Sequence, residues 1–322
     1  MITAARFIVA LTAASLATWA GPVCAQAYPS KPIRIIVPYA PGGSTDVLLR
    51  IFAPRLSEVL GQQVLIDNRP GAASIIGLDI VAKAPPDGYT AGIANIAYGA
   101  NPSLYRKMPF DTEKDFTPVG QIAIVTLVLS VHPSIPVRTV KEYIALARSK
   151  PGDLTYASAG NGSANHLAGA RFAHAAGLKL QHVPYKGGGP AVIAIVSGEV
   201  STLFATIPSA IQHFKSGRLR ALAVSSAKRN NALPELPTVA EAAPLPGFEA
   251  IQWQGVMLPA GTPREIVLKL NQAFAKVTSM PEVKEKVAAL GSDLVSGTAE
   301  QYEAFLKREL ATWSKVVKAV GM

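Results

Sequence analysis

The sequence predicts an α/β protein of two lobes joined by two crossing strands. Three observations predict this fold. Apolar, β-branched runs alternate with segments of helical periodicity, which is typical of α/β folds with mainly parallel sheets. Two longer apolar segments separate these sub-patterns, and the C-terminal region changes to amphipathic helices. A chain that crosses between lobes twice leaves a hinge and a cleft.

The first predicted unit is a strand, a glycine-rich turn and a helix. Residues 33–37 form the buried strand, and apolar residues at helical spacing follow from 47 to 60. Gly61 ends this helix, and Pro54 should kink it. The same pattern then repeats, with strands expected at 64–66 and 89–95 and a helix at 72–84.

The middle of the chain repeats the alternation of strand and helix. Thr139 and Glu142 match a capping box, which predicts a helix to about residue 149. Strands are then expected at 154–157, 180–184, 200–205 and 219–225, and helices at 164–176, 190–197 and 208–215.

The two long apolar segments, 122–131 and 251–258, are the predicted crossing strands. They divide the chain into a first part of lobe 1 (28–125), lobe 2 (126–253) and a second part of lobe 1 (254–322). Amphipathic helices are expected at 263–278, 281–290 and 298–319, packed on the outside of a sheet.

The first 27 residues read as a secretory signal peptide. Arg6 supplies the positive charge, an apolar stretch follows at 7–20, and small residues predict cleavage after Ala27. The stretch is shorter than the ~20 apolar residues that a membrane anchor needs. Cleavage removes Cys24, the one cysteine, so no disulfide framework is expected. The sequence therefore predicts an exported, periplasmic protein.

Composition excludes several classes. Hydrophobic residues make up 49% of the chain and charged residues 16%, which argues against disorder. The formal net charge of +10 favours an acidic partner, but export and the absence of long basic runs argue against nucleic acid. The five histidines lack metal-ligand spacing, and no nucleophile or zinc-hydrolase motif is present. We therefore expect a small-anion partner, no metal, no cofactor and no catalysis.

Two glycine-rich turns precede predicted helices, at 41–46 and 160–163. Backbone N–H groups at a helix start form a natural site for a carboxylate or phosphate. If the lobes face each other, the two turns meet across one cleft; the alternative is an ordinary connection in each lobe. The candidate anion-binding residues are Gly42, Gly43, Ser44, Thr45, Gly160, Asn161 and Ser163.

Other candidates have two interpretations each. Asp46 contacts a ligand or caps the turn locally. His166 contacts a ligand or packs its helix. Tyr98 lines the pocket or lies at the surface, and the glycine cluster 187–189 is a binding loop or a flexible turn.

Co-linear motifs occur along nearly all of the chain after residue 27, at 29–34, 37–46, 68–72, 86–90, 101–105, 156–163, 166–169, 183–187, 233–241 and 259–263. Together these motifs resemble the Bordetella-uptake-gene (Bug) type of extracytoplasmic solute receptor, the binding protein of tripartite tricarboxylate transporters.

This resemblance implies the type II, Venus-flytrap fold of periplasmic binding proteins, with a ligand carboxylate held between the two turns. It implies a ligand site formed by Tyr39, the residues of the turns, Asp46 and His166, with permease subunits as membrane partners. Ser201 and Thr206 stand where the family usually carries acidic stretches, and we include both as candidates. We expect a monomer that serves uptake; the alternatives are a periplasmic ligand sensor or an exported enzyme acting on a small anion.

Overall fold

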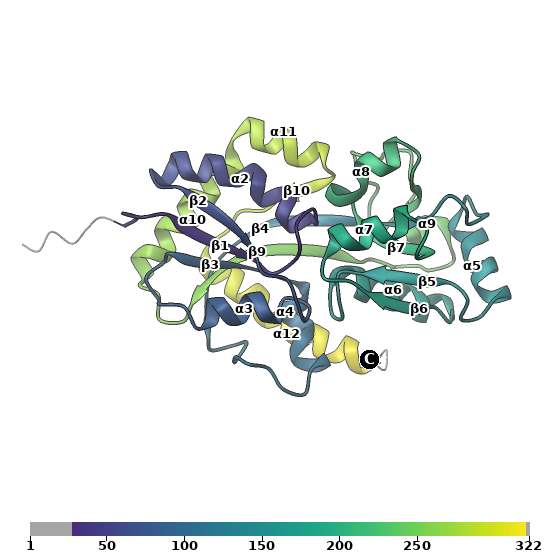
Figure 1. Ribbon diagram of the computed structural model, residues 1–322, viewed down its shortest axis with the longest axis horizontal. Coiled ribbons are helices and arrows are strands. Elements are labelled where there is room, and N and C mark those ends of the chain that lie inside the picture. Colours follow the sequence, from purple (N-terminus) through teal and green to yellow (C-terminus); the bar gives the residue numbers. More distant parts are fainter. Residues whose placement is uncertain (1–27, 320–322) are drawn as a thin grey trace, which may run out of the picture. The chain divides into compact units, whose positions relative to one another are not determined.

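Two groups of strands, joined through the long strand β4 that pairs in both, form the frame of the protein (Figure 1). The structure, a computed structural model, describes residues 28–319, and the described residues from Lys31 onward form one compact unit. The strand order is β2-β1-β3-β9-β4-β7-β5-β6, and β8 and β10 also pair with β4. The strands are β1 Ile33–Val37, β2 Val64–Asn68, β3 Thr90–Asn95, β4 Phe116–Val131, β5 Thr155–Ser158, β6 Gln181–Pro184, β7 Thr202–Thr206, β8 Arg220–Val224, β9 Ile251–Pro259 and β10 Ser292–Leu294.

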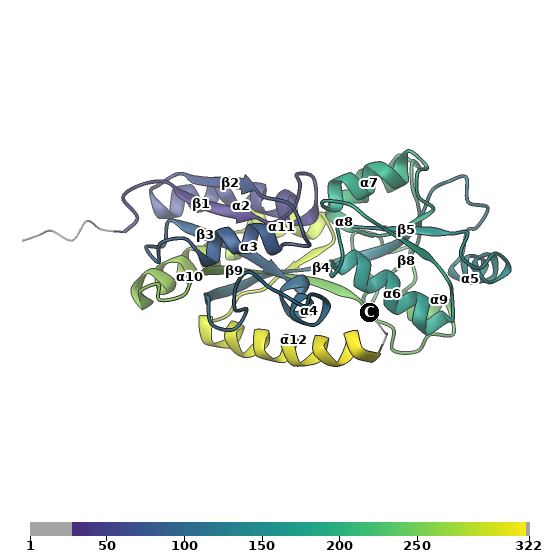
Figure 2. The same cartoon turned by 60° about the horizontal axis from the view of Figure 1, so that its bottom comes forward.

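The helices cover these strands on both faces. They are α2 Ser44–Leu60, α3 Ile75–Ala82, α4 Ile96–Leu104, α5 Val140–Ser149, α6 Ala164–Ala176, α7 Gly188–Val196, α8 Ile207–Lys215, α9 Val239–Ala242, α10 Arg264–Ser279, α11 Pro281–Ala289 and α12 Ala299–Ala319. In the first lobe, α2, α10 and α11 pack together, whereas α12 packs with α4 (Figure 2). The expected C-terminal helices are therefore confirmed as the outer layers of that lobe.

Strand alternation explains how one strand serves two layers. On β9, Val256 faces Phe274 of α10, whereas Trp253 packs edge-on against Tyr302 of α12. On β7 of the second lobe, Phe204 joins one core with Phe172 of α6, and its neighbours join another core beneath α7. The apolar runs thus build a core on each face of each sheet.

The crossing strands are β4 and β9. β4 pairs with β9 and β10 in the first lobe and with β7 and β8 in the second, and all of these pairings are antiparallel. β3 also pairs with β9 in the antiparallel sense. The remaining pairs are parallel, β1 with β2 and β3 in the first lobe, and β5 with β6 and β7 in the second. The two-lobe fold with two crossing strands is confirmed. The expected lobe boundaries fall inside β4 and β9, and they stay predictions.

Two expectations about elements need correction. The helix expected at 72–84 begins only at Ile75, because Ala72, Ala73 and Ser74 take left-handed backbone angles. The sequence pattern predicts no helix at Ile96–Leu104, where α4 lies with Pro102 in its interior. The predicted signal peptide and its cleavage at Ala27 lie outside the described residues. Within residues 28–319, no helix combines the length and apolarity needed to span a membrane.

Candidate functional site

The two lobes touch at a pair of glycine-rich segments. The amide of Ala40 in the first lobe donates a hydrogen bond to the carbonyl of Lys186 in the second, at 3.1 Å. A Cβ built on Gly189 would lie 2.3 Å from the carbonyl oxygen of Pro41. Only glycine permits this approach. The glycine cluster 187–189, whose role the sequence leaves open, is therefore the segment that closes against the first turn.

A cavity of about 20 Å³, which we call the inner cavity, lies beside this contact and has walls from both lobes. Its volume suits one or two water-sized groups, which is the size of a carboxylate head. Six of the predicted candidates line it, namely Tyr39, Gly43, Ser44, Thr45, Ser163 and Thr206. The expectation that the two turns meet at one cleft is thus met in the geometry.

Five helices begin at the inner cavity. The residue at or just before the start of each lines it: Gly43 for α2, Asn95 for α4, Ser163 for α6, Gly188 at the start of α7 and Thr206 for α8. Each helix start carries free N–H groups and about half a positive charge. In α2, α7 and α8, no described side chain caps the start by a hydrogen bond.

The lining of the inner cavity is polar but holds no carboxylate. Sequence reasoning missed Asn95, Asn165 and Gln252, all of which are buried. Gln252 accepts a 3.4 Å hydrogen bond from Ser44, and Asn165 donates a 2.6 Å bond to the carbonyl of Phe204. A glutamine within the apolar 251–258 strand was the available signal. The helix starts make the electrostatic field in the inner cavity positive, and no acidic side chain in its lining would repel an anion.

Tyr39 forms one wall of the inner cavity. Its hydroxyl donates a 3.2 Å hydrogen bond to Oδ1 of Asn95, which also accepts from the amide of Ala97. Burial raises the pKa of Tyr39 to about 12, so its hydroxyl stays a neutral donor.

A second space of about 200 Å³, the outer cavity, also borders Tyr39 and Ala159. Gly160, Asn161 and Lys186 line it, so it is open to an anion as well. Its other wall includes the left-handed residues Ala72 and Ala73. Non-glycine residues in such angles are strained, and strain of this kind clusters at ligand sites.

Asp46 holds the first turn instead of lining either cavity. Its carboxylate accepts hydrogen bonds from the amide of Gly42 at 3.0 Å, from Arg50 at 3.0 Å and from Asn68 at 3.1 Å. Burial disfavours its charge, but these bonds outweigh burial and lower its pKa. The local interpretation of Asp46 is the one that the geometry matches, and Gly42 is held by the same bond.

His166 holds the second turn from behind and lines neither cavity. Its Nδ1 accepts a 3.1 Å hydrogen bond from the amide of Gly162, and its ring stacks on His182 at 4.1 Å between centroids. His182 in turn bonds Ser158 at 2.6 Å through Nε2. Burial lowers the pKa of each imidazole to about 4, so both are neutral at pH 7.

Two candidates lie away from the cleft. Tyr98 is buried in the first lobe, where it packs edge-on against Phe116 and donates to the carbonyl of Thr112. Tyr98 therefore lines neither cavity and does not lie at the surface, because α4 turns its ring into the core, so both interpretations of it are wrong. Ser201 bonds Thr155 before the start of β7. It lies five residues from Thr206, or ~16 Å along an extended strand, so it does not reach the cleft.

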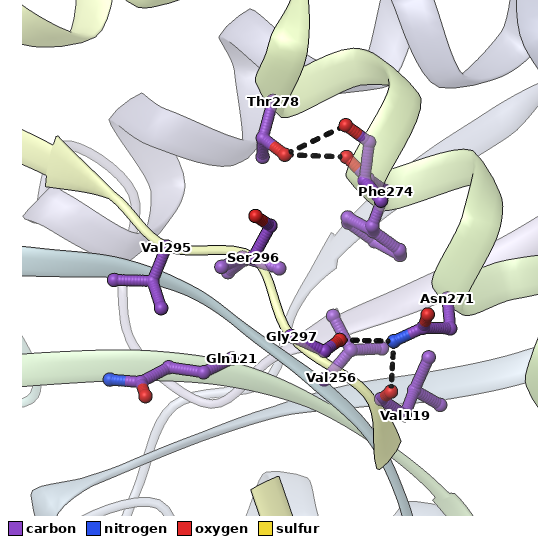
Figure 3. Close-up of a pocket in the computed structure, with 12 residues that line it drawn as sticks. Val119, Gln121, Val256, Asn271, Phe274, Thr278, Val295, Ser296 and Gly297 are labelled. Atoms are coloured by element: carbon purple, nitrogen blue, oxygen red, sulfur yellow. Dashed lines mark hydrogen bonds between the residues drawn. The ribbon is translucent and has the colours of Figure 1, made fainter. Parts of the chain in front are cut away.

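A crevice in the first lobe is a structural feature only. Figure 3 shows the Asn271 amide donating to the carbonyls of Val119 and Gly297, both at 2.8 Å. The remaining space is about 10 Å³, too small for a ligand. These bonds fasten α10 to β4 and to the segment after β10. Among residues 28–319 there is no cluster of three or more groups able to hold a metal ion.

Known proteins resemble this chain in sequence and in fold. Residues 48–322 match the family described as "Tripartite tricarboxylate transporter family receptor". The chain is 38% identical to protein BugT of Bordetella pertussis over 94% of this chain and 93% of BugT. It resembles the solved structure of an R. palustris protein with adipate, at TM-score 0.89 and 38% identity over 91% and 98% of the two chains. MatC of Rhodopseudomonas palustris, solved with bound malate, follows at TM-score 0.85 and 29% identity over 90% and 100%.

Proposed function

The chain belongs to the tripartite tricarboxylate transporter receptor family, and on this premise we propose that its inner and outer cavities together hold one small organic carboxylate. Receptors of this family are periplasmic solute-binding proteins. The chain is accordingly a solute-binding protein for carboxylate uptake and not an enzyme. The expectation drawn from its motifs is confirmed at this level.

One observation carries the proposed site: five helix starts border a cavity that no acidic side chain lines. Several helix dipoles that converge on one point favour an anion there and penalise a cation. The hydroxyls of Ser44, Thr45 and Ser163 add donors that suit carboxylate oxygens. A carboxylate head therefore fits the inner cavity.

The body of the ligand extends into the outer cavity. The two cavities share Tyr39 and Ala159, and the outer one has room for a short carbon chain. Lys186 lines that space and supplies a positive charge for a second carboxylate. Relatives solved with adipate and with malate make dicarboxylates the natural first ligands to test.

Binding in this cleft requires the lobes to move apart and close again. The contact of Gly189 with Pro41 and the packing of α2 against α8 bar direct entry to the inner cavity. Closure over a ligand then joins surfaces of both lobes into one face. We propose that membrane permease subunits bind this face of the closed protein. On this proposal the protein serves uptake and not sensing. Residues 1–27 would act as the signal peptide that directs export to the periplasm. The exported protein would be a monomer.

The test is a thermal-shift screen of the full chain against mono- and dicarboxylates, with the matching diamides as uncharged controls. Ligands that bind the folded state raise the melting temperature. We expect at least one dicarboxylate to raise it and the diamides to leave it unchanged. Equal shifts with acids and diamides would overturn the anion site.

A further inference from the structure

A larger cavity lies on the opposite side of the crossing strands from the cleft. This back cavity has a volume of about 300 Å³. On β9, Gln252 lines the inner cavity while the next residue, Trp253, lines the back cavity. Successive strand residues point to opposite faces. Asn95 and Ile96 divide in the same way, and Ala164 borders both spaces. The two cavities therefore lie back to back.

Both lobes contribute walls to the back cavity. Leu167 and Arg171 come from α6 of the second lobe, and Phe305, Glu309 and Trp313 come from α12 of the first. Figure 2 shows α12 running beneath α4 toward the side of α6. A rotation of the lobes about β4 and β9 would change the distance between these walls.

Three aromatic rings and two carboxylates line the back cavity among aliphatic side chains. One oxygen of Glu309, Oε2, accepts hydrogen bonds from the indoles of Trp253 at 2.6 Å and Trp313 at 3.1 Å. Its Oε1 accepts none from the described residues. Glu249 is a second carboxylate in the lining, whereas Arg171 is its one basic side chain, so the formal charge is negative.

We propose that the back cavity is a second binding site, which takes a small organic ammonium ion with an apolar body. Indole and phenyl faces attract ammonium groups at short range. Glu309 and Glu249 supply the opposite charge, and the apolar walls suit a hydrocarbon body of the size that such a volume admits. The back cavity therefore favours a cation, whereas the cleft favours an anion.

Occupation of the back cavity is coupled to closure of the cleft. In this structure the inner cavity has only about 20 Å³ while the back cavity has about 300 Å³. An ammonium ligand that fits the back cavity in this arrangement stabilises the closed lobes, and linkage then requires that it raise carboxylate affinity. This coupling rests on the proposed function, whereas the ammonium site itself does not.

Tryptophan fluorescence reports on the site directly. The chain holds three tryptophans, and two of them, Trp253 and Trp313, line the back cavity. The full chain with Trp19→Phe leaves these two alone. Titration with 2-phenylethylammonium should give a saturable change with a Kd in the millimolar range or below, which is about −4 kcal/mol or better. The neutral analogue 2-phenylethanol should give none. No saturable change with the amine, or an equal one with the alcohol, overturns the site.

Substitutions that remove a carboxylate charge test whether the amine binds in the back cavity. Glu309→Gln keeps an oxygen for the two indoles and removes the charge, so amine affinity should fall at least tenfold. Glu249→Gln, at an exposed position, should weaken it several-fold and keeps the test open if Glu309→Gln does not fold. Glu303→Gln is the matched control, because Glu303 lies on α12 and pairs with Lys307 at 2.7 Å outside the cavity. Wild-type affinity in both Glu309→Gln and Glu249→Gln would refute the proposal.

The coupling between the back cavity and the cleft is tested in a separate experiment. Malate or adipate affinity is measured with and without saturating 2-phenylethylammonium, and a several-fold tighter Kd is expected with the amine. An unchanged Kd would remove the coupling. If no carboxylate binds at all, this result counts against the proposed function. The amine titration of the same sample still tests the ammonium site.

Discussion

Gly43 of the first lobe and Gly188 of the second are in contact: a Cβ built on Gly43 would lie 3.4 Å from the Gly188 amide nitrogen, and one built on Gly188 would lie 3.3 Å from Cα of Gly43. Each glycine lies at the start of a helix that points toward the inner cavity. The contact exists only while the lobes are closed. A substitution at this contact can therefore change ligand binding in the cleft without changing the folding of either lobe.

Replacing Gly43 by valine should abolish carboxylate binding and leave the unliganded protein folded. Gly43 has an extended backbone, with φ at −77°, so valine is not strained there. Its methyl groups would instead meet Gly188 and hold the lobes apart. Calorimetric titration and thermal melting check the two halves, with Ala289→Val on the exposed side of α11 as control. Wild-type affinity would remove the first turn from the site.

Ser163→Ala should weaken carboxylate binding without unfolding the protein. The hydroxyl lines the inner cavity and also caps α6 through the amide of His166. A lost bond to a charged ligand is worth ~1.5–3 kcal/mol, or about ten- to a hundredfold in Kd. Thr139→Ala removes a comparable cap from α5, remote from the cleft, and should cost only stability, about 1 kcal/mol. Equal affinities of the two variants would exclude Ser163 from the site.

Asp46→Asn should loosen the first turn and weaken binding indirectly. Asp46 is almost fully buried, and its bonds to Gly42, Arg50 and Asn68 favour the charged form. Loss of that charge should cost ~1.5–3 kcal/mol of folding free energy, measured by urea unfolding. Because the folded pKa is lowered, the same stabilisation is present above the ordinary pKa of 3.8 and is lost as pH falls below it. An unchanged urea midpoint at pH 7 would contradict this role.

The stacked histidines make the second turn sensitive to acid. Burial lowers the pKa of His166 and His182 to about 4 in the folded state, below the ordinary 6.5. The unfolded chain therefore binds more protons between pH 6.5 and 4, and folding stability falls as pH drops through this window. Protonated His166 also cannot accept the Gly162 amide. Histidine NMR titration should show both rings neutral at pH 5; titration of either ring near 6.5 would refute this account.

Local elements followed from the sequence, whereas the convergence of helix starts did not. Residues 164–176 were expected as a helix and form α6 over the same span, because Ser163 and Gly177 mark its ends. Asn95 and Gln252 line the same cavity but come from strands far apart in the chain, so no local pattern links them to the turns.

The misplaced candidates have physical reasons as well. Tyr98 follows a strand that ends at the cleft, but the unexpected helix α4 rotates it into the core. Ser201 precedes β7 and Thr206 is its last residue, so strand direction alone decides which of the two meets the cleft. Sequence spacing did not supply that direction. The two glycine-rich turns were found because helix starts with glycine are visible locally.

The most direct measurement of the central claim is a calorimetric titration of the full chain with adipate and malate, each beside its diamide. The account predicts one site per chain, a Kd on the order of micromolar (about −8 kcal/mol) for at least one acid, and no heat from either diamide. Diamide binding as tight as that of the acid would contradict a cleft built on helix starts for an anion.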